Sequence, residues 1–361
     1  MRVSIPTISL DPLVTKAFPQ VSKTEAVSRL VSFIEPGNVA VLTGAGISVD
    51  SGIRAYRGQN GRYLNPNYHP IFFHELADPT PKGHRFRQRY WARSYLGWPA
   101  IKEAKPSTSH YAIGALQYSN LVHKLITQNV DGLHGKAIPI TWGAYEKQRR
   151  ILELHGRLRT VSCTRGHSQS RAVFQERISS LNPSWRKYVD ELARTGSEPR
   201  TNPDGDVELR GRYFTDFVVP NCELCLLEGV NADEASIIKP DVIFFGESIS
   251  SAVKDRSFRD LECCDKLLVI GTTLATYSAF RIVKHALEVG KPVMMLNIGP
   301  TRADKFERIE KIEMKSGAVL TDVCSLVLGP KAHHDPELRR LMMSGVVQPP
   351  IDDTADNDTG G

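Results

Sequence analysis

The chain has 361 residues, 41% of them hydrophobic, which is enough to bury a sizeable core in one large domain or two unequal ones. Lysine and arginine exceed aspartate and glutamate by 46 to 40, and a net charge of +6 is too small for the dense basic surface of a nucleic-acid binder. No apolar run approaches the roughly 18 residues that span a bilayer, and the six irregularly spaced cysteines do not form a secreted disulfide framework. We therefore expect an intracellular protein with no nucleic-acid or membrane partner, and we expect it to act as a monomer.

Short apolar runs alternate with stretches of helical periodicity along the chain. Each run ends in Gly, Asn or a turn, and five of them predict buried strands at 38–42, 121–127, 241–245, 267–271 and 292–297. Apolar residues recur at helical spacing over 24–34, 110–116 and 277–289. This alternation predicts an α/β fold, a Rossmann-like parallel sheet with helices on both faces, whose ligands bind at the carboxyl ends of the strands.

Two stretches interrupt the alternation. Residues 55–106 are rich in Arg, His, Tyr and Pro, and they predict a loop followed by a helical excursion. Residues 158–236 hold three cysteines in polar, Pro- and Gly-rich sequence, which indicates an inserted module. We therefore expect a Rossmann-like domain built from 24–157 and 237–330, with a smaller module at 158–236. A short helix should then lead into a largely disordered acidic tail within 331–361.

The first predicted strand runs directly into a glycine-rich turn, Gly44-Ala45-Gly46, and then Ile and Ser48. Glycines let backbone amides approach a pyrophosphate at the start of a helix. The third glycine of the dehydrogenase fingerprint would fall at position 49, which is Val49, so hydride transfer is disfavoured. The alternative interpretation is an ordinary strand–helix turn.

Polar side chains also follow the next strands. Gln128, Asn129 and Asp131 come directly after the strand at 121–127, where amide and carboxylate groups can bind a ribose hydroxyl or a carboxamide. Turn chemistry alone is the alternative explanation for Asn and Asp in such a loop. His155, followed by Gly156, ends another short run, and an exposed imidazole there can act as a base near neutral pH.

Together these motifs resemble those of the sirtuin family, the NAD-dependent lysine deacylases. The three loops match in order and spacing, and Lys-Pro-Asp-Val-Ile-Phe-Phe-Gly-Glu at 239–247, Gly-Thr-Thr-Leu at 271–274 and Leu-Asn at 296–297 match further along. The resemblance covers roughly residues 24–328. Tyr-Trp-Ala-Arg at 90–93, with similar stretches at 182–185, 203–206 and 276–278, is closest to the class II branch, which includes a mitochondrial enzyme. A fungal or similarly divergent member fits this pattern.

The resemblance implies a reaction and the residues that carry it. An acyl-lysine amide oxygen attacks the ribose of NAD, nicotinamide leaves, and the acyl group passes to ADP-ribose. The match assigns His155 as the general base, with Asn129 and Asp131 beside it at the ribose and nicotinamide. Val242, Phe245 and Gly246 match the segment that holds the acyl-lysine peptide by strand addition. The matched NAD-binding residues are Gly44, Ala45, Gly46, Ser48, Tyr56, Arg57, Gln128, Asn129, Asp131, Gly271, Thr272, Thr273, Asn297 and Cys324.

The family's structural zinc site, two C-x-x-C pairs, is altered here. Cys222 and Cys225 form an intact pair, but Cys163 is followed by Gly166 where its partner should stand. His167 comes one residue later and can supply a nitrogen ligand in a Cys₃His site. We expect Cys163, His167, Cys222 and Cys225 to bind zinc, which makes 158–236 a zinc-binding module. Buried thiols without a metal are the alternative.

A second departure concerns the nicotinamide pocket. The family's Pro-Asp pair is replaced by Arg54-Ala55, which removes a carboxylate and adds a cation beside a cationic leaving group unless Arg54 points outward. A slow enzyme or a non-catalytic NAD-binding scaffold is therefore one alternative. A protein ADP-ribosyltransferase is another, since both reactions begin with the same nicotinamide cleavage.

The acyl preference and the compartment are inferred from the class II likeness. Tyr90 and Arg93 lie three residues apart on the predicted helix, and an arginine pairs well with a carboxylated acyl chain. A solvated helix face is the alternative. We expect a longer, acidic or lipoyl-type acyl group rather than acetyl. A mitochondrial matrix location is expected, with the cytoplasm or nucleus as the alternative; the acid-poor N-terminus, which contains Arg2 and Lys16, supports it weakly.

Overall fold

A six-stranded parallel sheet forms the larger of two lobes in the computed structural model, which describes residues 20–57, 70, 72–196, 202–205, 207, 213–231 and 236–350. The strand order is β3-β2-β1-β7-β8-β9, and every neighbouring pair is parallel. The strands are β1 (Val39–Thr43), β2 (Val122–Thr127), β3 (Ile151–Glu153), β7 (Lys266–Ile270), β8 (Val293–Leu296) and β9 (Ile309–Ile312). The order reverses direction at β1 and β7, which is where such sheets bind ligands.

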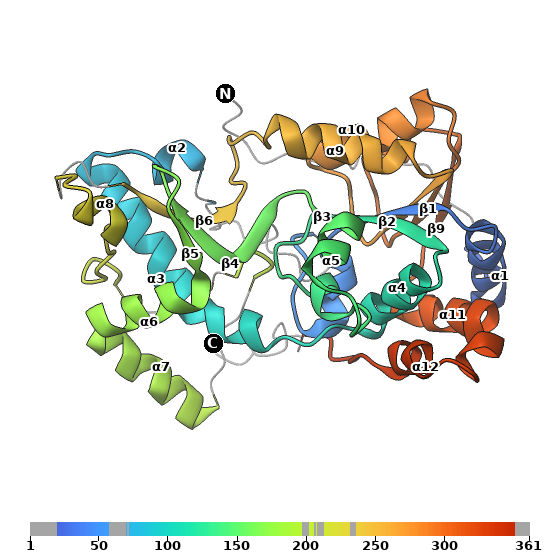
Figure 1. Ribbon diagram of the computed structural model, residues 1–361, viewed down its shortest axis with the longest axis horizontal. Helices are drawn as coiled ribbons and strands as arrows, with labels where there is room; N and C mark the ends of the chain where they lie inside the picture. Colours follow the sequence, from blue (N-terminus) through green and yellow to red (C-terminus); the bar gives the residue numbers. More distant parts are fainter. Residues whose placement is uncertain are drawn as a thin grey trace, which may run out of the picture.

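Alternate residues of the central strand face opposite layers of helices. Val39 and Val41 join one apolar cluster, while Ala40 and Leu42 join another. Helices α9 and α10 cover the face of Ala40 and Leu42, and helices α1, α4, α11 and α12 lie on the opposite side (Figure 1). Their bounds are α1 (Lys23–Ile34), α4 (Thr108–Tyr118), α9 (Ser251–Glu262), α10 (Tyr277–Glu288), α11 (Ser316–Ala332) and α12 (Pro336–Met343), with α5 (Ala144–Arg150), η1 (Ala45–Ser51) and η3 (His134–Lys136) near the strand ends.

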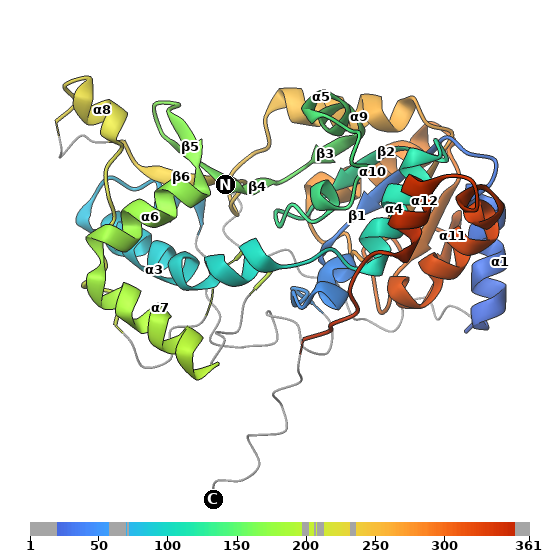
Figure 2. The same cartoon turned by 60° about the horizontal axis from the view of Figure 1, so that its bottom comes forward.

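The smaller lobe is built on a three-stranded antiparallel sheet of order β5-β4-β6 (Figure 2). Its aromatic core includes Trp91, which meets the ring of Phe174 edge to face at 4.7 Å, and Trp185, which meets Phe217 at 5.2 Å. Its elements are β4 (Gly156–Cys163), β5 (Ser168–Ser170), β6 (Ile238–Val242), α2 (Phe73–Leu76), α3 (Pro81–Glu103), α6 (Arg171–Leu181), α7 (Pro183–Thr195) and α8 (Glu223–Leu227).

The expected fold class is confirmed, with two corrections to the expected boundaries. The strand expected at 241–245 begins and ends earlier, as β6, and it pairs with β4 of the small sheet, so the small lobe continues to Val242 rather than ending at 236. Helix α3, expected within the Rossmann-like domain, packs its aromatic side chains into the core of the small lobe. Apolar periodicity predicted where strands and helices form, but it did not specify which sheet they join.

The C-terminal region is also more ordered than expected. Helix α12 buries Leu338 and Leu341 in the core of the large lobe, and Val346 forms a bridge with Ser107. The expected tail 331–361 therefore has structure as far as 350, while 351–361 lies outside the described residues. Among the described helices, none is both long and apolar enough to cross a membrane.

Candidate active site

The glycine-rich turn after β1 packs directly on the loop after β7. The amide of Gly44 donates to the carbonyl of Ile270 at 3.1 Å, and that of Gly46 donates to the carbonyl of Gly271 at 2.9 Å. A Cβ on Gly44 would lie 2.6 Å from Cβ of Thr272, and one on Gly46 would lie 2.8 Å from Cα of Gly271. Only glycine fits this approach of two backbones, which brings the predicted residues 44–46 and 271–272 together.

Asn129 and Asp131, predicted at the end of β2, meet Ser48 on η1. The Asn129 amide donates to Ser48 Oγ at 3.1 Å, and Ser48 donates to Asp131 Oδ2 at 2.8 Å. The other oxygen of Asp131 accepts from the amide of Leu133 at 2.9 Å. Burial raises the pKa of Asp131, while the hydrogen bonds from Leu133 and Ser48 oppose that rise. The structure thus brings three predicted residues into one polar cluster at the strand ends.

Two histidines that the sequence analysis did not single out lie beneath this cluster. His110 Nε2 is 3.4 Å from Ser48 Oγ, and His134 Nε2 is 2.9 Å from Thr43 Oγ1. The two rings are 4.6 Å apart. Burial lowers the pKa of His134 to about 3 and that of His110 well below its ordinary value, so both are neutral. They line the floor of the cluster as hydrogen-bonding groups, not as charges.

We expect these buried histidines to make the fold sensitive to acid. Their folded pKa values lie below about 6.5, so the unfolded chain binds protons that the folded chain does not, and stability falls as pH drops below 6.5. Each site removes about 1.4 kcal/mol per pH unit in that window. A His134→Gln variant should therefore lose about one proton's worth of pH dependence between pH 6.5 and 5, measured by urea unfolding at several pH values. If the free energy of unfolding changes equally with pH in the two proteins, this prediction is wrong. The raised pKa of Asp131 has the opposite effect on stability as pH falls, but that effect is the same in both proteins.

His155 lies where β3 turns into β4, between the two lobes. Its Nε2 is 2.7 Å from Ser278 Oγ, and its carbonyl accepts from the amide of Ile243 at 3.0 Å. Burial lowers the pKa of His155 to about 4; a hydrogen bond to the Gln128 backbone carbonyl opposes the shift, and the charge of Arg281 adds to it. The imidazole is therefore neutral at physiological pH and has the protonation state of a general base.

Several other predicted cofactor residues gather at the ends of β2, β7 and β8, but Cys324 does not. Gln128 donates to Thr272 Oγ1 at 2.8 Å and accepts from Thr276 at 3.2 Å. Asn297 follows β8 and donates to the carbonyl of Ile298 at 2.9 Å. Thr273 stands in the same loop as Thr272. Cys324, by contrast, is buried in the core between α11 and α4, where its thiol donates to the carbonyl of Ala112 at 3.4 Å, so the structure does not bring it to the strand ends.

The loop that follows η1 carries the altered pair. Arg54 is only 7% exposed, so it does not point outward. Ala55, Tyr56 and Arg57 follow at the end of this described segment, and all three are half-buried. The amide of Ile53 donates to the Ser48 carbonyl at 3.3 Å, which ties the start of this loop to the polar cluster.

The predicted peptide-binding segment leaves β6 and runs between the lobes. Val242 pairs with Gly156 beside His155, and Phe245 accepts a hydrogen bond from the amide of Phe73 at 2.9 Å. Gly246 has a φ of +83°, which ends the segment in a turn that favours glycine. The segment is thus anchored at both ends, beside His155 and against α2.

The two residues assigned to acyl recognition have structural contacts of their own. The ring of Tyr90 is 6% exposed and packs edge to face on Trp91 at 5.2 Å and on Phe244 at 5.4 Å. Arg93 Nε donates to the carbonyl of Val207 at 2.8 Å. Both residues therefore help to hold α3 against its neighbours, and Phe244 links Tyr90 to the peptide-binding segment.

Cys163, His167, Cys222 and Cys225 come together as expected for a metal site. Their ligand atoms lie within 4.8 Å of one another; the sulfurs of Cys163 and Cys225 are 3.8 Å apart, and His167 Nδ1 is 3.2 Å from the Cys225 sulfur. Tetrahedral zinc with bonds of about 2.3 Å to sulfur separates its sulfur ligands by roughly 3.8 Å, so the spacing fits that ion. Glu228 lies 3.0 Å from His167 Nε2, the kind of carboxylate partner that orients a ligating imidazole.

Gly166 explains how histidine replaces the missing cysteine. Its φ of +95° turns the chain back after Cys163, and the amide of Gly166 donates to the Cys163 carbonyl at 2.9 Å. The Cys163 amide in turn donates to the carbonyl of His167 at 2.9 Å. One extra residue in this tight turn therefore delivers the longer imidazole to the same place.

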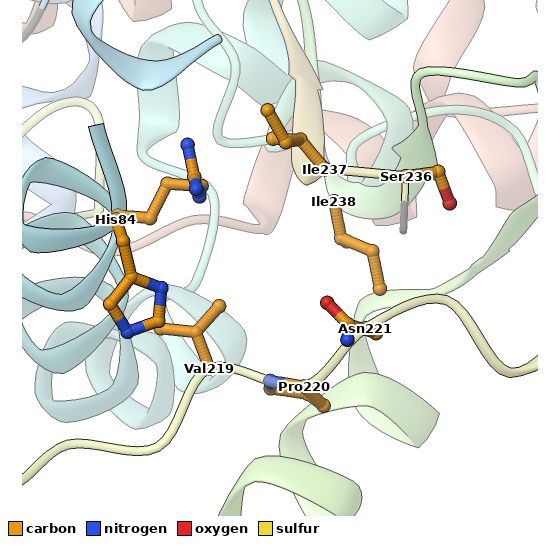
Figure 3. A pocket seen from close by; sticks show the side chains of 8 residues that line it. His84, Val219, Pro220, Asn221, Ser236, Ile237 and Ile238 are labelled. Carbon is orange, nitrogen blue, oxygen red and sulfur yellow. The ribbon is translucent and has the colours of Figure 1, made fainter. Parts of the chain in front are cut away.

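A small cavity is lined by His84 of α3 and by residues 219–221 and 236–238 (Figure 3). It holds about 40 Å³, room for little more than a water molecule. Ser236 on its wall donates to the Cys225 sulfur at 2.8 Å, and Asn221 precedes Cys222 in the chain. The cavity therefore borders the segments that carry the cysteine ligands.

Several known proteins are similar to this chain in sequence and in fold. The sequence model described as the Sir2 family matches residues 44–278. The NAD-dependent protein deacylase SIR4 of Batrachochytrium dendrobatidis is 40% identical over 310 residues, 84% of this chain and 95% of that protein. The human NAD-dependent protein lipoamidase sirtuin-4, mitochondrial, is 36% identical over 299 residues, 82% of this chain and 85% of that protein.

Solved structures agree. One described as showing the structural basis for the mechanism and regulation of Sir2 enzymes shares 25% identity and a TM-score of 0.55, covering 85% of this chain and 99% of that one. A Sir2 homologue–NAD complex shares 22% identity and a TM-score of 0.57, covering 88% of this chain and 98% of that one.

Proposed function

This chain belongs to the Sir2 family, and from that premise we propose that it is an NAD-dependent protein-lysine deacylase, which cleaves NAD to nicotinamide and transfers the acyl group to ADP-ribose. The observation that carries the proposal is the neutral imidazole of His155, held between the peptide-binding segment and the polar cluster at the strand ends. A base in that position meets both substrates at once.

The site residues divide the work between binding and proton transfer. NAD supplies an electrophilic ribose carbon with nicotinamide as its leaving group. The glycine-rich turn at Gly44–Gly46 and the polar loop at Thr272 would lie against its phosphates and adenosine end, while Asn129 and Asp131 would hold the ribose and carboxamide. His155 accepts a proton from a ribose hydroxyl. Residues that hold the reacting groups in line would lower the barrier to attack on the ribose carbon.

The zinc ion, held by Cys163, His167, Cys222 and Cys225, has a structural role in this proposal. Its ligands lie in the small lobe, away from His155, and all four protein positions are filled by side chains. A closed tetrahedral site without an open position supports folding and not hydrolysis.

We propose that the acyl group is longer than acetyl, and acidic or lipoyl-like. The likeness to relatives called lipoamidase sirtuin-4 supports a longer chain, and Arg93 on α3 offers a guanidinium for a carboxylate. Nicotinamide release should be measured with NAD and peptides carrying acetyl, carboxylated, long-chain or lipoyl lysine. Release on any peptide above the level without peptide supports the deacylase, and the ranking identifies the acyl class.

Arg93→Leu is expected to change that ranking. Loss of a charge-assisted hydrogen bond costs about 1.5–3 kcal/mol, so kcat/KM for the carboxylated peptide should fall roughly tenfold or more while the lipoyl peptide changes little. Arg85→Leu, at an exposed position of the same helix, is the matched control. An equal loss on every peptide would show that Arg93 acts through the packing of α3 and not on the acyl chain.

Two other activities remain as alternatives for the same site. A protein ADP-ribosyltransferase would yield modified protein in place of O-acyl-ADP-ribose, so mass analysis of the products distinguishes them. A non-catalytic NAD-binding scaffold is supported by Arg54-Ala55, since a lost carboxylate and a buried cation would both disfavour the positive charge that develops on the ribose as nicotinamide leaves. Tight NAD binding without release on any peptide would establish that scaffold.

The cellular setting is proposed from the relatives alone. The bovine and human relatives are described as mitochondrial, which supports a mitochondrial matrix location for this chain. Its partners are then acyl-lysine proteins, with no direct contact to nucleic acid or membrane, and a monomer suffices because the described lobes contain both halves of the site.

A further inference from the structure

The imidazole of His155 is held by a hydroxyl from the start of helix α10. Ser278, in the first turn of that helix, places Oγ 2.7 Å from Nε2 of His155. Among the described residues, His155 is the side chain with which Ser278 pairs. Ser278 comes from β7–α10 and His155 from the β3–β4 corner, so this contact joins the large sheet to the junction between the lobes.

The partners of the imidazole determine where its proton lies. The backbone carbonyl of Gln128 only accepts, so the ring nitrogen that faces it carries the hydrogen. With Nε2 engaged by Ser278, that donor is the other ring nitrogen, and in the neutral ring Nε2 keeps its lone pair. The Ser278 hydroxyl then donates to Nε2.

The charges around the ring favour this neutral form. Arg281 lies three residues after Ser278 on α10, and its charge, after burial, lowers the pKa of His155. Asp255 on the facing helix α9 acts on Arg281 and not directly on the imidazole. The positive N-terminus of α10 adds to the same effect.

We propose that Ser278 is a positioning residue for acyl transfer. Its hydroxyl holds His155 in the tautomer whose Nε2 is basic, and it keeps the Nε2 lone pair oriented until the ribose hydroxyl replaces Ser278 as the hydrogen-bond donor. The inference rests on the proposed deacylase activity. It concerns one step: the ribose hydroxyl proton moves to Nε2, and the neutral imidazole becomes an imidazolium.

That step can be separated from the one before it. Attack of the amide oxygen on the ribose carbon breaks the bond to nicotinamide without removing a proton, so it does not need a base. Exchange of labelled nicotinamide into NAD reports this first step. Formation of deacylated peptide requires both the first step and the proton transfer that follows it. A defect in the position of His155 should therefore slow deacylation and spare exchange.

The test compares Ser278→Ala and Ser278→Thr with the native chain. We expect the alanine variant to deacylate about tenfold or more slowly, with nicotinamide exchange and KM for NAD within about twofold. The threonine variant, which keeps a hydroxyl, should recover most of the rate. Since a hydrogen bond to neutral Nε2 disfavours protonation, the acidic limb of the alanine variant's pH–rate profile should move to higher pH. Ser251→Ala, in the exposed first turn of α9, is the control.

The outcomes are distinguishable. If the native chain catalyses neither exchange nor deacylation, the proposed function fails. If the native chain is active and Ser278→Ala matches it, or if exchange and deacylation fall together without rescue by threonine, Ser278 does not position the base and this inference alone is overturned.

Discussion

A His155→Ala variant is expected to lose steady-state deacylation by about a hundredfold or more while it still binds NAD. The imidazole contacts Ser278 and Gln128, and neither contact closes the glycine-rich turn or the cluster of Asn129, so the cofactor pocket should remain. Product formation and NAD affinity should be measured on the same preparations. The loss of NAD binding together with activity would show that His155 supports the fold and not the chemistry.

The native enzyme should also keep its activity in mild acid. Burial holds the pKa of His155 near 4, so in the free enzyme the base stays neutral as pH falls from 8 to 6. His285→Ala is a matched control for His155→Ala. His285 lies in the last turn of α10, where it pairs with Glu262 of α9 at 2.7 Å. It should leave both the rate and its pH dependence unchanged.

The sequence predicted the large sheet and the polar residues that follow its strands, because both depend on local patterns. A buried run that ends in glycine or a polar cluster is a strand end, and parallel strands bring such ends together. Gly44, Asn129 and Asp131 could therefore be assigned to one place before any coordinates. The Cys₃His set was equally accessible, since the resemblance implied a second cysteine at position 166 and His167 stands one residue later.

What the sequence could not show depends on contacts between distant segments. His110 and His134 carry no spacing signal, and a histidine on an apolar helix face is commonly a structural residue. Their roles appear only when α4 and η3 meet beneath Ser48. Cys324 shows the opposite error, since a likeness in order placed it at the cofactor while α11 carries it into the core. For the same reason the sequence did not show which sheet β6 joins, because its pairing with β4 depends on tertiary contacts.

Removal of one zinc ligand should have the second large effect. Cys225→Ser is expected to abolish stoichiometric zinc and to destabilise the small lobe by several kcal/mol, because Cys225 is fully buried and contacts both Cys163 and His167. Metal content and thermal unfolding measure the two effects. Cys263→Ser, at an exposed cysteine of α9's C-terminal end, should change neither.

Three further variants separate the effect of the metal from that of the thiols. His167→Cys restores four sulfur ligands in the turn shaped by Gly166, and it should retain zinc, whereas His167→Ala should not. Glu228→Gln removes the carboxylate partner of the imidazole, so it should weaken zinc binding by about 10- to 100-fold without abolishing it. A native chain that holds no zinc, and a Cys225→Ser variant as stable as the native chain, would mean that the cluster is a packed set of thiols. Loss of zinc from a chain that binds it should also affect the active site, because the small lobe carries α3 and the start of the peptide-binding segment. The contact between Tyr90 and Phe244 would transmit the change, so peptide affinity should fall before NAD affinity.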